Sequence, residues 1–149
     1  MALHKDSRDP LNANQSRMAT NGLTFTVDST SDDADSVYGD GLCQTAAGEC
    51  TLRAAISESN AQLGENSIHF NIPGGGVHTI QLAEALPTVN DMTGGVTIDG
   101  FTQPGTSENT DPLANNSTIL IEIRGMGIDA FSNIAVSYTH LTLPTILLV

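Results

Sequence analysis

The chain lacks tryptophan altogether, and aromatic residues make up only 4% of its 149 positions. Together with the rest of the composition, this scarcity argues against a helical bundle. Threonine, serine, asparagine, aspartate and glycine are abundant instead, which favours short strands joined by turns. With 39% hydrophobic residues, the chain is long enough for one domain with its own core.

Basic residues are also scarce, because 5 lysines and arginines stand against 17 aspartates and glutamates, for a net charge of −12. Such a chain repels a phosphate backbone, so we expect no nucleic-acid partner. An acidic, threonine- and asparagine-rich surface with few lysines is typical of extracellular proteins. It also offers oxygen ligands to divalent cations.

Long apolar runs are missing as well, which predicts no membrane insertion. Residues 1–22 lack the apolar centre of a secretory signal, and we expect them to form a disordered N-terminal segment. The last residues, 136–149, begin with VSYTHLTLPT, which resembles a translated sequencing adapter. We therefore interpret 136–149 as a non-native tail; the alternative is a genuine apolar final strand.

Alternation of apolar and polar residues predicts several short strands. In LTFTVD, Leu23, Phe25 and Val27 share one face, while the threonines between them face solvent. In SIHFNI, His69 is out of phase with its apolar neighbours and is expected to face solvent. The predicted strands cover residues 23–28, 67–72, 78–82, 96–100 and 118–125.

The spacing of these strands argues against tight hairpins. Ile80 and Ile98 are 18 residues apart and Ile98 and Ile121 are 23 apart, with Gly100 and Gly125 closing two of the strands. Spacings near 20 suit a solenoid in which successive strands stack on one another.

One amphipathic helix is predicted over residues 51–64, ending at Gly64. The residues at helical spacing on one face are Leu52, Ala55, Ile56, Ser59 and Leu63. A solenoid needs its first turn covered, and this helix is placed to cover it.

The helix begins with CTLRAAI, Cys50 to Ile56, which resembles the Cys-Ser-Leu-Arg-Glu-Ala-Ile motif of bacterial right-handed parallel β-helix proteins. FTVDSTSDDAD, IHFNIPGGGVHTIQLAEALPTV and VTIDGFTQPG stand in the order of that family. Two positions differ: Thr51 keeps a capping hydroxyl, whereas Ala54 replaces a first-turn carboxylate that could pair with Arg53.

The resemblance implies an all-β fold, a right-handed parallel β-helix fragment with an N-terminal capping α-helix. Residues 23–135 would form the cap and the first coils, with Leu52, Arg53 and Ile56 as structural residues of the motif. It also implies a secreted or cell-surface protein whose partner is the remainder of its own β-helix. It assigns no reaction.

Cys43 and Cys50, the chain's two cysteines, enclose six residues of a polar loop. A disulfide closing so short a loop is worth about 2.5 kcal/mol by chain entropy. No CxxC pattern or adjacent histidine supports a metal centre or a catalytic thiol, so a disulfide in an oxidising compartment is favoured.

The loop before the cysteines is crowded with carboxylates. Asp32, Asp33, Asp35 and Asp40 are candidate Ca²⁺ ligands, because Ca²⁺ takes six to eight oxygens from such loops. The spacing misses the EF-hand pattern. Ordinary solvated turn chemistry is the other interpretation, and it is favoured.

A third candidate group is Asp99, Glu122 and Arg124, which point outward if the neighbouring isoleucines point inward. A polysaccharide lyase would need outward carboxylates with a basic residue. Aligning Gly100 with Gly125 predicts instead that Asp99 and Arg124 form a cross-strand ion pair, and this structural interpretation is favoured.

These observations favour a structural or adhesive surface module with no catalysis in the residues present. It would require no cofactor, with Ca²⁺ at the aspartates as the alternative. Its partners would be carbohydrate or cell-surface components. The alternative is a lyase or hydrolase of the pectate-lyase type with its active site on downstream coils. Further outward carboxylates with arginine or lysine downstream would favour the enzyme.

Overall fold

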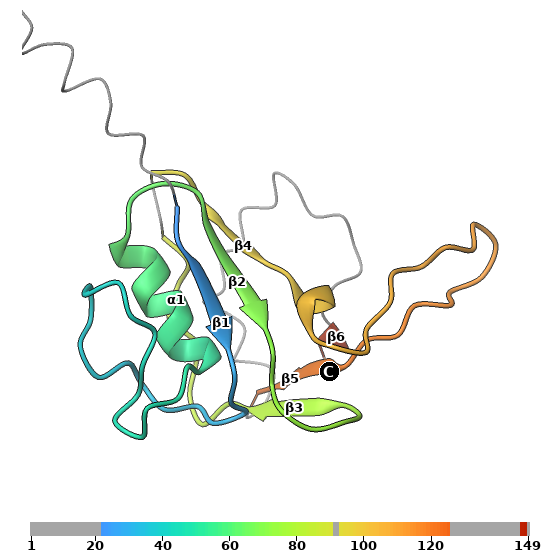
Figure 1. Cartoon of the computed structure of the whole chain (residues 1–149), viewed down its shortest axis with the longest axis horizontal. Helices are drawn as coiled ribbons and strands as arrows, with labels where there is room; N and C mark the ends of the chain where they lie inside the picture. Colours follow the sequence, from blue (N-terminus) through green and yellow to red (C-terminus); the bar gives the residue numbers. More distant parts are fainter. Residues whose placement is uncertain (1–21, 91–92, 126–146, 149) are drawn as a thin grey trace, which may run out of the picture.

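The computed structural model describes residues 22–90, 93–125 and 147–148 (Figure 1). The elements are β1 (Thr24–Val27), α1 (Leu52–Ala61), β2 (Asn66–Phe70), β3 (His78–Gln81), β4 (Val96–Ile98), the 3-10 helix η1 (Gly100–Thr102), β5 (Ile121–Arg124) and β6 (Leu147–Leu148). Residues 1–21 and 136–146, which carry most of the predicted disordered segment and non-native tail, lie outside the described residues.

The strands form two separate three-stranded sheets. In the first, β1, β2 and β4 lie side by side in that order, and in the second the order is β3, β5, β6. Every strand pair described is parallel. From β2 to β5 the chain alternates between the two sheets, so within this stretch no strand pairs with the one that follows it in sequence.

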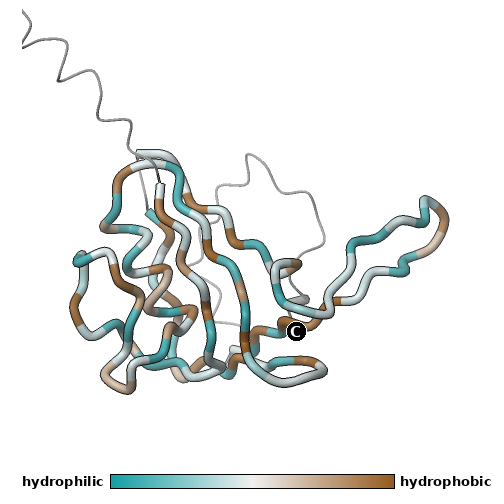
Figure 2. The backbone as a smooth tube through the Cα atoms, viewed as in Figure 1, coloured by the Kyte–Doolittle hydropathy of each residue, from teal (hydrophilic) through white to brown (hydrophobic). Residues whose placement is uncertain are grey.

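The register of the pairing brings apolar residues of distant segments together. Phe25 faces Ile68, and Ile68 faces Ile98 on its other side. In the second sheet Ile80 faces Ile123. The hydropathy colouring alternates along the strands of the first sheet (Figure 2), as expected where one side of a sheet is buried.

The inward side chains of both sheets and of α1 form one core. Its fully buried members include Val27, Leu52, Ile68 and Phe70. The remaining buried members of this cluster are Phe25, Cys50, Ala55, Ile56, Ile72, Ile80, Leu82, Leu86, Ile121 and Ile123. The helix therefore contributes to the same core as the strands.

Helix α1 lies against the face of the first sheet that carries the core (Figure 1). It ends earlier than the sequence predicts, because Gln62 is already extended and Leu63 is 55% exposed. The buried amide of Asn66 donates to the Ser59 carbonyl (3.1 Å) and accepts from the Leu23 N–H (2.8 Å). This side chain joins the end of the helix to β1 and β2.

Beyond β2, the buried Gln103 takes the place of a neighbouring strand. Its amide accepts from the Ile72 N–H (2.8 Å) and donates to the Ile72 carbonyl (2.9 Å). Both backbone groups of a buried residue are thereby satisfied, as they must be away from water. After Gln103 the chain forms a loop, residues 104–120, that projects away from the sheets (Figure 1).

The prediction of an all-β, right-handed parallel β-helix is wrong for the described residues. They form a few short strands in two small parallel sheets with one helix in the core, and no closed solenoid turn. A β-helix of the predicted kind needs the strands after α1 to stack directly on one another in sequence order, and they do not. Ile80 and Ile98 instead lie in different sheets, since side-chain alternation reveals the buried face of a strand but not its neighbour.

Candidate functional site

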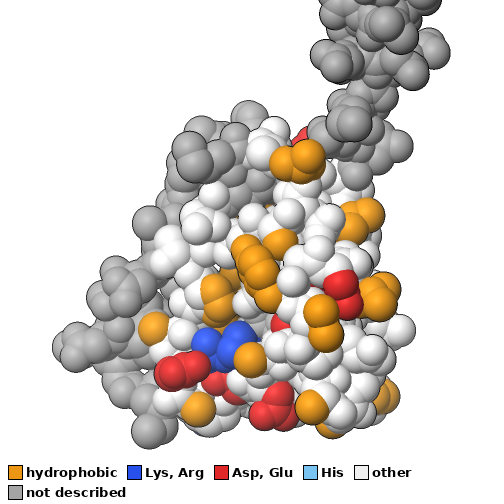
Figure 3. All heavy atoms as spheres, turned by 90° about the vertical axis from the view of Figure 1, so that its left-hand side faces the viewer, with side chains coloured by type: hydrophobic (Ala, Val, Ile, Leu, Met, Phe, Trp, Pro, Cys, Tyr) orange, Lys and Arg blue, Asp and Glu red, His pale blue; other side chains and the backbone are white. Residues whose placement is uncertain are grey.

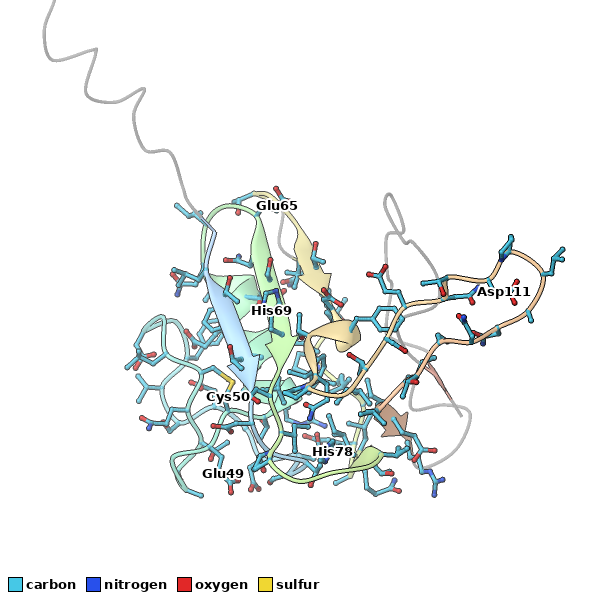
Figure 4. The ribbon with its side chains drawn as sticks, turned by 45° about the vertical axis from the view of Figure 1, so that its right-hand side comes forward. Glu49, Cys50, Glu65, His69, His78 and Asp111 are labelled. Carbon is cyan, nitrogen blue, oxygen red and sulfur yellow. A yellow bond between two sulfur atoms is a disulfide. The ribbon has the colours of Figure 1, made fainter. Side chains whose placement is uncertain are left out.

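Chemistry-bearing side chains gather in the acidic loop, which we define as residues 28–50, and along the helix that follows it. Cys43 and Cys50 form a disulfide with their Cα atoms 5.0 Å apart, which confirms the predicted bond (Figure 4). Cys50 is buried in the core, and its N–H donates to the Asp28 carboxylate (2.8 Å). The disulfide therefore attaches a polar loop to the core at the start of α1.

Arg53 forms the second anchor of the acidic loop, and only 7% of its side chain is exposed. Its Nε and Nη2 atoms donate to the two carboxylate oxygens of Asp32 at 3.0 and 2.8 Å. The same guanidinium donates to the carbonyls of Glu84 and Ala85, each at 2.9 Å. This planar, five-donor group joins α1, the acidic loop and the segment after β3.

The helix start is held by Thr51, which is fully buried. Its hydroxyl accepts from the Ala54 N–H (3.0 Å), the ordinary N-cap bond, and donates to the Asp33 carbonyl (2.7 Å). Leu52 and Ile56 are buried in the core, as predicted. The CTLRAAI segment thus has a structural role throughout.

Sequence reasoning missed Glu58, a carboxylate with no exposed surface. Its two oxygens accept the N–H groups of Gly39 and Gly41, both at positive φ. A signal was present, since Glu58 lies three residues beyond Ala55 on the buried face of the helix. Only the fold shows that a glycine turn of the acidic loop lies over it.

The four aspartates proposed for Ca²⁺ do not gather at one point. Asp32 pairs with Arg53, and Asp33 accepts from the Ser31 hydroxyl (2.6 Å). Oxygens of Asp35 and Asp40 lie within 4.8 Å of each other and of a Glu58 oxygen. These are the residues that could hold a cation together.

Each of these carboxylates also has backbone partners of its own. Asp35 accepts from the N–H groups of Val37 (3.0 Å) and Gln44 (2.9 Å), and Asp40 accepts from Leu42 (2.8 Å). The contacts with Val37 and Leu42, each two residues along the chain, are ordinary turn chemistry. Calcium binding stays a prediction.

Asp99, Glu122 and Arg124 lie on two different sheets, and the predicted pairing of Asp99 with Arg124 is wrong. Asp99 caps η1 by accepting from the Phe101 N–H (2.9 Å). Arg124 contacts Glu122 of its own strand at 2.9 Å. The Gly100 to Gly125 alignment failed because β4 and β5 are not neighbours.

The Glu122 carboxyl has a lowered pKa. The main cause is a hydrogen bond from the Thr79 hydroxyl (2.5 Å), followed by the bond from Arg124. Because the unfolded chain then binds more protons, this group stabilises the fold at pH above its ordinary pKa of 4.5. Its contribution is lost as the pH falls through the lower folded value.

We expect Glu122→Gln to flatten the loss of stability as the pH falls from 4.5 downward. Urea unfolding followed by far-UV circular dichroism at several acid pH values measures this. Glu108→Gln removes the same charge at an exposed position. We expect it to lose stability with falling pH as steeply as the parent chain does. If the free energy of unfolding falls equally steeply with decreasing pH in both variants, the Glu122 carboxylate does not have the stabilising role assigned to it.

Acidic side chains lie on both sides of a single basic patch on the molecular face in Figure 3.

Among the described residues, no helix is long and apolar enough to cross a membrane. The disulfide is compatible with an extracellular location. Comparison with protein-family models, curated proteins and solved structures finds no match for this chain.

Proposed function

We propose that the chain is a disulfide-stabilised structural or adhesive module of a secreted or cell-surface protein, with no catalysis in the described residues. The Cys43–Cys50 disulfide carries the proposal. Disulfides persist in oxidising compartments, and this one stabilises a loop that has little apolar surface to bury. The net charge of −12 supports a partner other than nucleic acid.

The use of the charged residues supports a non-catalytic role. Arg53 and Asp32 neutralise each other in a buried pair, and Glu58 holds a glycine turn. Glu122 and Arg124 form an ion pair within β5. Asp99 caps the 3-10 helix η1, which follows β4 of the other sheet. Each group already has a partner that stabilises the fold, which disfavours the lyase alternative for these residues. Carbohydrate is the surface component we propose as the partner.

The proposal is tested by displaying the full chain on bacterial cells and confirming, by the absence of reactive thiols, that the disulfide is present. Retention of these cells on films of neutral and anionic polysaccharides is then measured together with the release of oligosaccharides. We expect retention on at least one film without release. Release of oligosaccharides, or no retention on any film, would overturn the proposal.

A further inference from the structure

The outer face of the first sheet carries a regular set of polar side chains. Parallel pairing places Thr24, Ser67 and Thr97 in one row across β1, β2 and β4. Thr26 and His69 form the next row. These residues alternate with the buried Phe25 and Ile68, so they point away from the core and from α1, as Figure 4 shows for His69.

The hydroxyls on this face have no partners in residues 22–90 and 93–125. The side chains of Thr24, Thr26, Ser67 and Thr97 make no hydrogen bond within that part of the chain. The three threonines are exposed and Ser67 is half-buried. Each hydroxyl therefore retains one donor and two acceptor positions for a ligand.

The outer face of the second sheet is different, because its polar groups satisfy one another. The Thr79 hydroxyl donates to Glu122, Glu122 contacts Arg124, and the Gln81 amide donates to the Arg124 carbonyl (3.1 Å). Outward polar residues on a sheet of this protein can thus bond internally. The free hydroxyls of the first sheet are a property of that face.

From this contrast we infer that the outer face of β1, β2 and β4 binds a neutral polysaccharide, which deepens the proposed function and rests on it. Strand geometry places the hydroxyls roughly 4.8 Å apart across the sheet and about 6.6 Å apart along each strand. A polymer with hydroxyls on every sugar can meet several of these groups at once, so that weak single bonds add up.

Charge selects the neutral class of polymer. The rows contain no lysine, arginine, aspartate or glutamate. Asp28 and Asp99, which follow β1 and β4, already accept from the N–H groups of Cys50 and Phe101. An anionic polysaccharide would approach a chain of net charge −12 without a cation on this face to compensate. A neutral polymer needs only the donors and acceptors that the hydroxyls supply.

The experiment measures co-sedimentation of the oxidised full chain with insoluble cellulose, and retention on a polygalacturonate gel. We expect binding to cellulose and at least tenfold weaker binding by the variant Thr24→Val/Thr26→Val/Thr97→Val. Valine matches threonine in shape and favours strands, so the fold is retained. The matched control Thr30→Val/Thr118→Val changes exposed threonines elsewhere and should bind like the parent chain.

Serine at the same three positions keeps the hydroxyls and should bind within threefold of the parent. If the valine variant fails to fold, Thr26→Val alone should weaken binding about threefold. Unchanged binding by the valine variants, or retention on polygalacturonate alone, would overturn the inference and leave the proposed function standing. No binding to either polymer overturns the inference, while the display experiment, with its other films, decides the proposed function separately.

Discussion

Replacing Arg53 by alanine is expected to lower the free energy of unfolding by about 3–5 kcal/mol, because it leaves the carboxylate of Asp32 buried without its partner. Three segments lose a common anchor at once, since the same guanidinium holds the carbonyls of Glu84 and Ala85. Equilibrium urea unfolding followed by far-UV circular dichroism measures the change.

The matched control is Arg124→Ala. Arg124 also pairs with a carboxylate of this chain, but 55% of its side chain is exposed. An exposed pair of this kind contributes only about 0–1 kcal/mol. Both variants remove one arginine and one contact with a solvent-exposed partner, since Arg53 also lies 3.5 Å from the exposed Glu84 carboxylate. The buried pair with Asp32 is what distinguishes them. A loss for Arg53→Ala no larger than that for Arg124→Ala would contradict the assignment.

Because a loss of this size approaches the whole stability of a small domain, Arg53→Ala can fail to fold. Arg53→Lys keeps the charge but lacks the planar fork that spans both Asp32 oxygens. We expect it to fold with a stability between those of the parent and the alanine variant. If the lysine variant is as stable as the parent chain, the positive charge at position 53 stabilises the fold without the planar guanidinium.

Removing the disulfide through Cys43→Ser/Cys50→Ser is expected to lower the free energy of unfolding by about 2.5 kcal/mol, the chain-entropy value for so short a loop. The effect should concentrate in the acidic loop. Hydrogen exchange of the Gly39 and Gly41 amides, both bonded to Glu58, should quicken more than exchange in β2.

Reduction of the parent chain serves as the independent comparison, since Cys50 also packs in the core and serine changes that packing. A reductant should destabilise the parent by a similar amount and leave the double-serine variant unchanged. If reduction leaves the stability and the amide exchange of the parent unaltered, the disulfide has no stabilising role here.

Several parts of the structure could be predicted from local patterns. The alternation in LTFTVD and SIHFNI located β1 and β2 and placed His69 on the outward side, because a strand has a period of two. Helical spacing located α1, and the distance between Cys43 and Cys50 allowed their disulfide. These features depend on residues close together in the chain.

Pairing partners and buried charges could not be predicted in this way. Ile68 meets Ile98, and Ile80 meets Ile123, across connections whose path the local pattern does not encode. For the same reason the local pattern does not reveal that Asp99 caps η1, that Arg124 pairs with Glu122, or that Glu58 holds the glycine turn. Asp32 was grouped with its acidic neighbours, although burial beside Arg53 decides its role.

The sequence by itself determined where β1 to β5 and α1 form, which side of each is apolar, and that the chain is strongly acidic. Only the tertiary structure decided that two small sheets share a core with the helix, and that one outer face keeps its hydroxyls free. The reason is physical: periodicity acts over a few residues, whereas pairing and desolvation depend on distant segments that meet only in the folded chain.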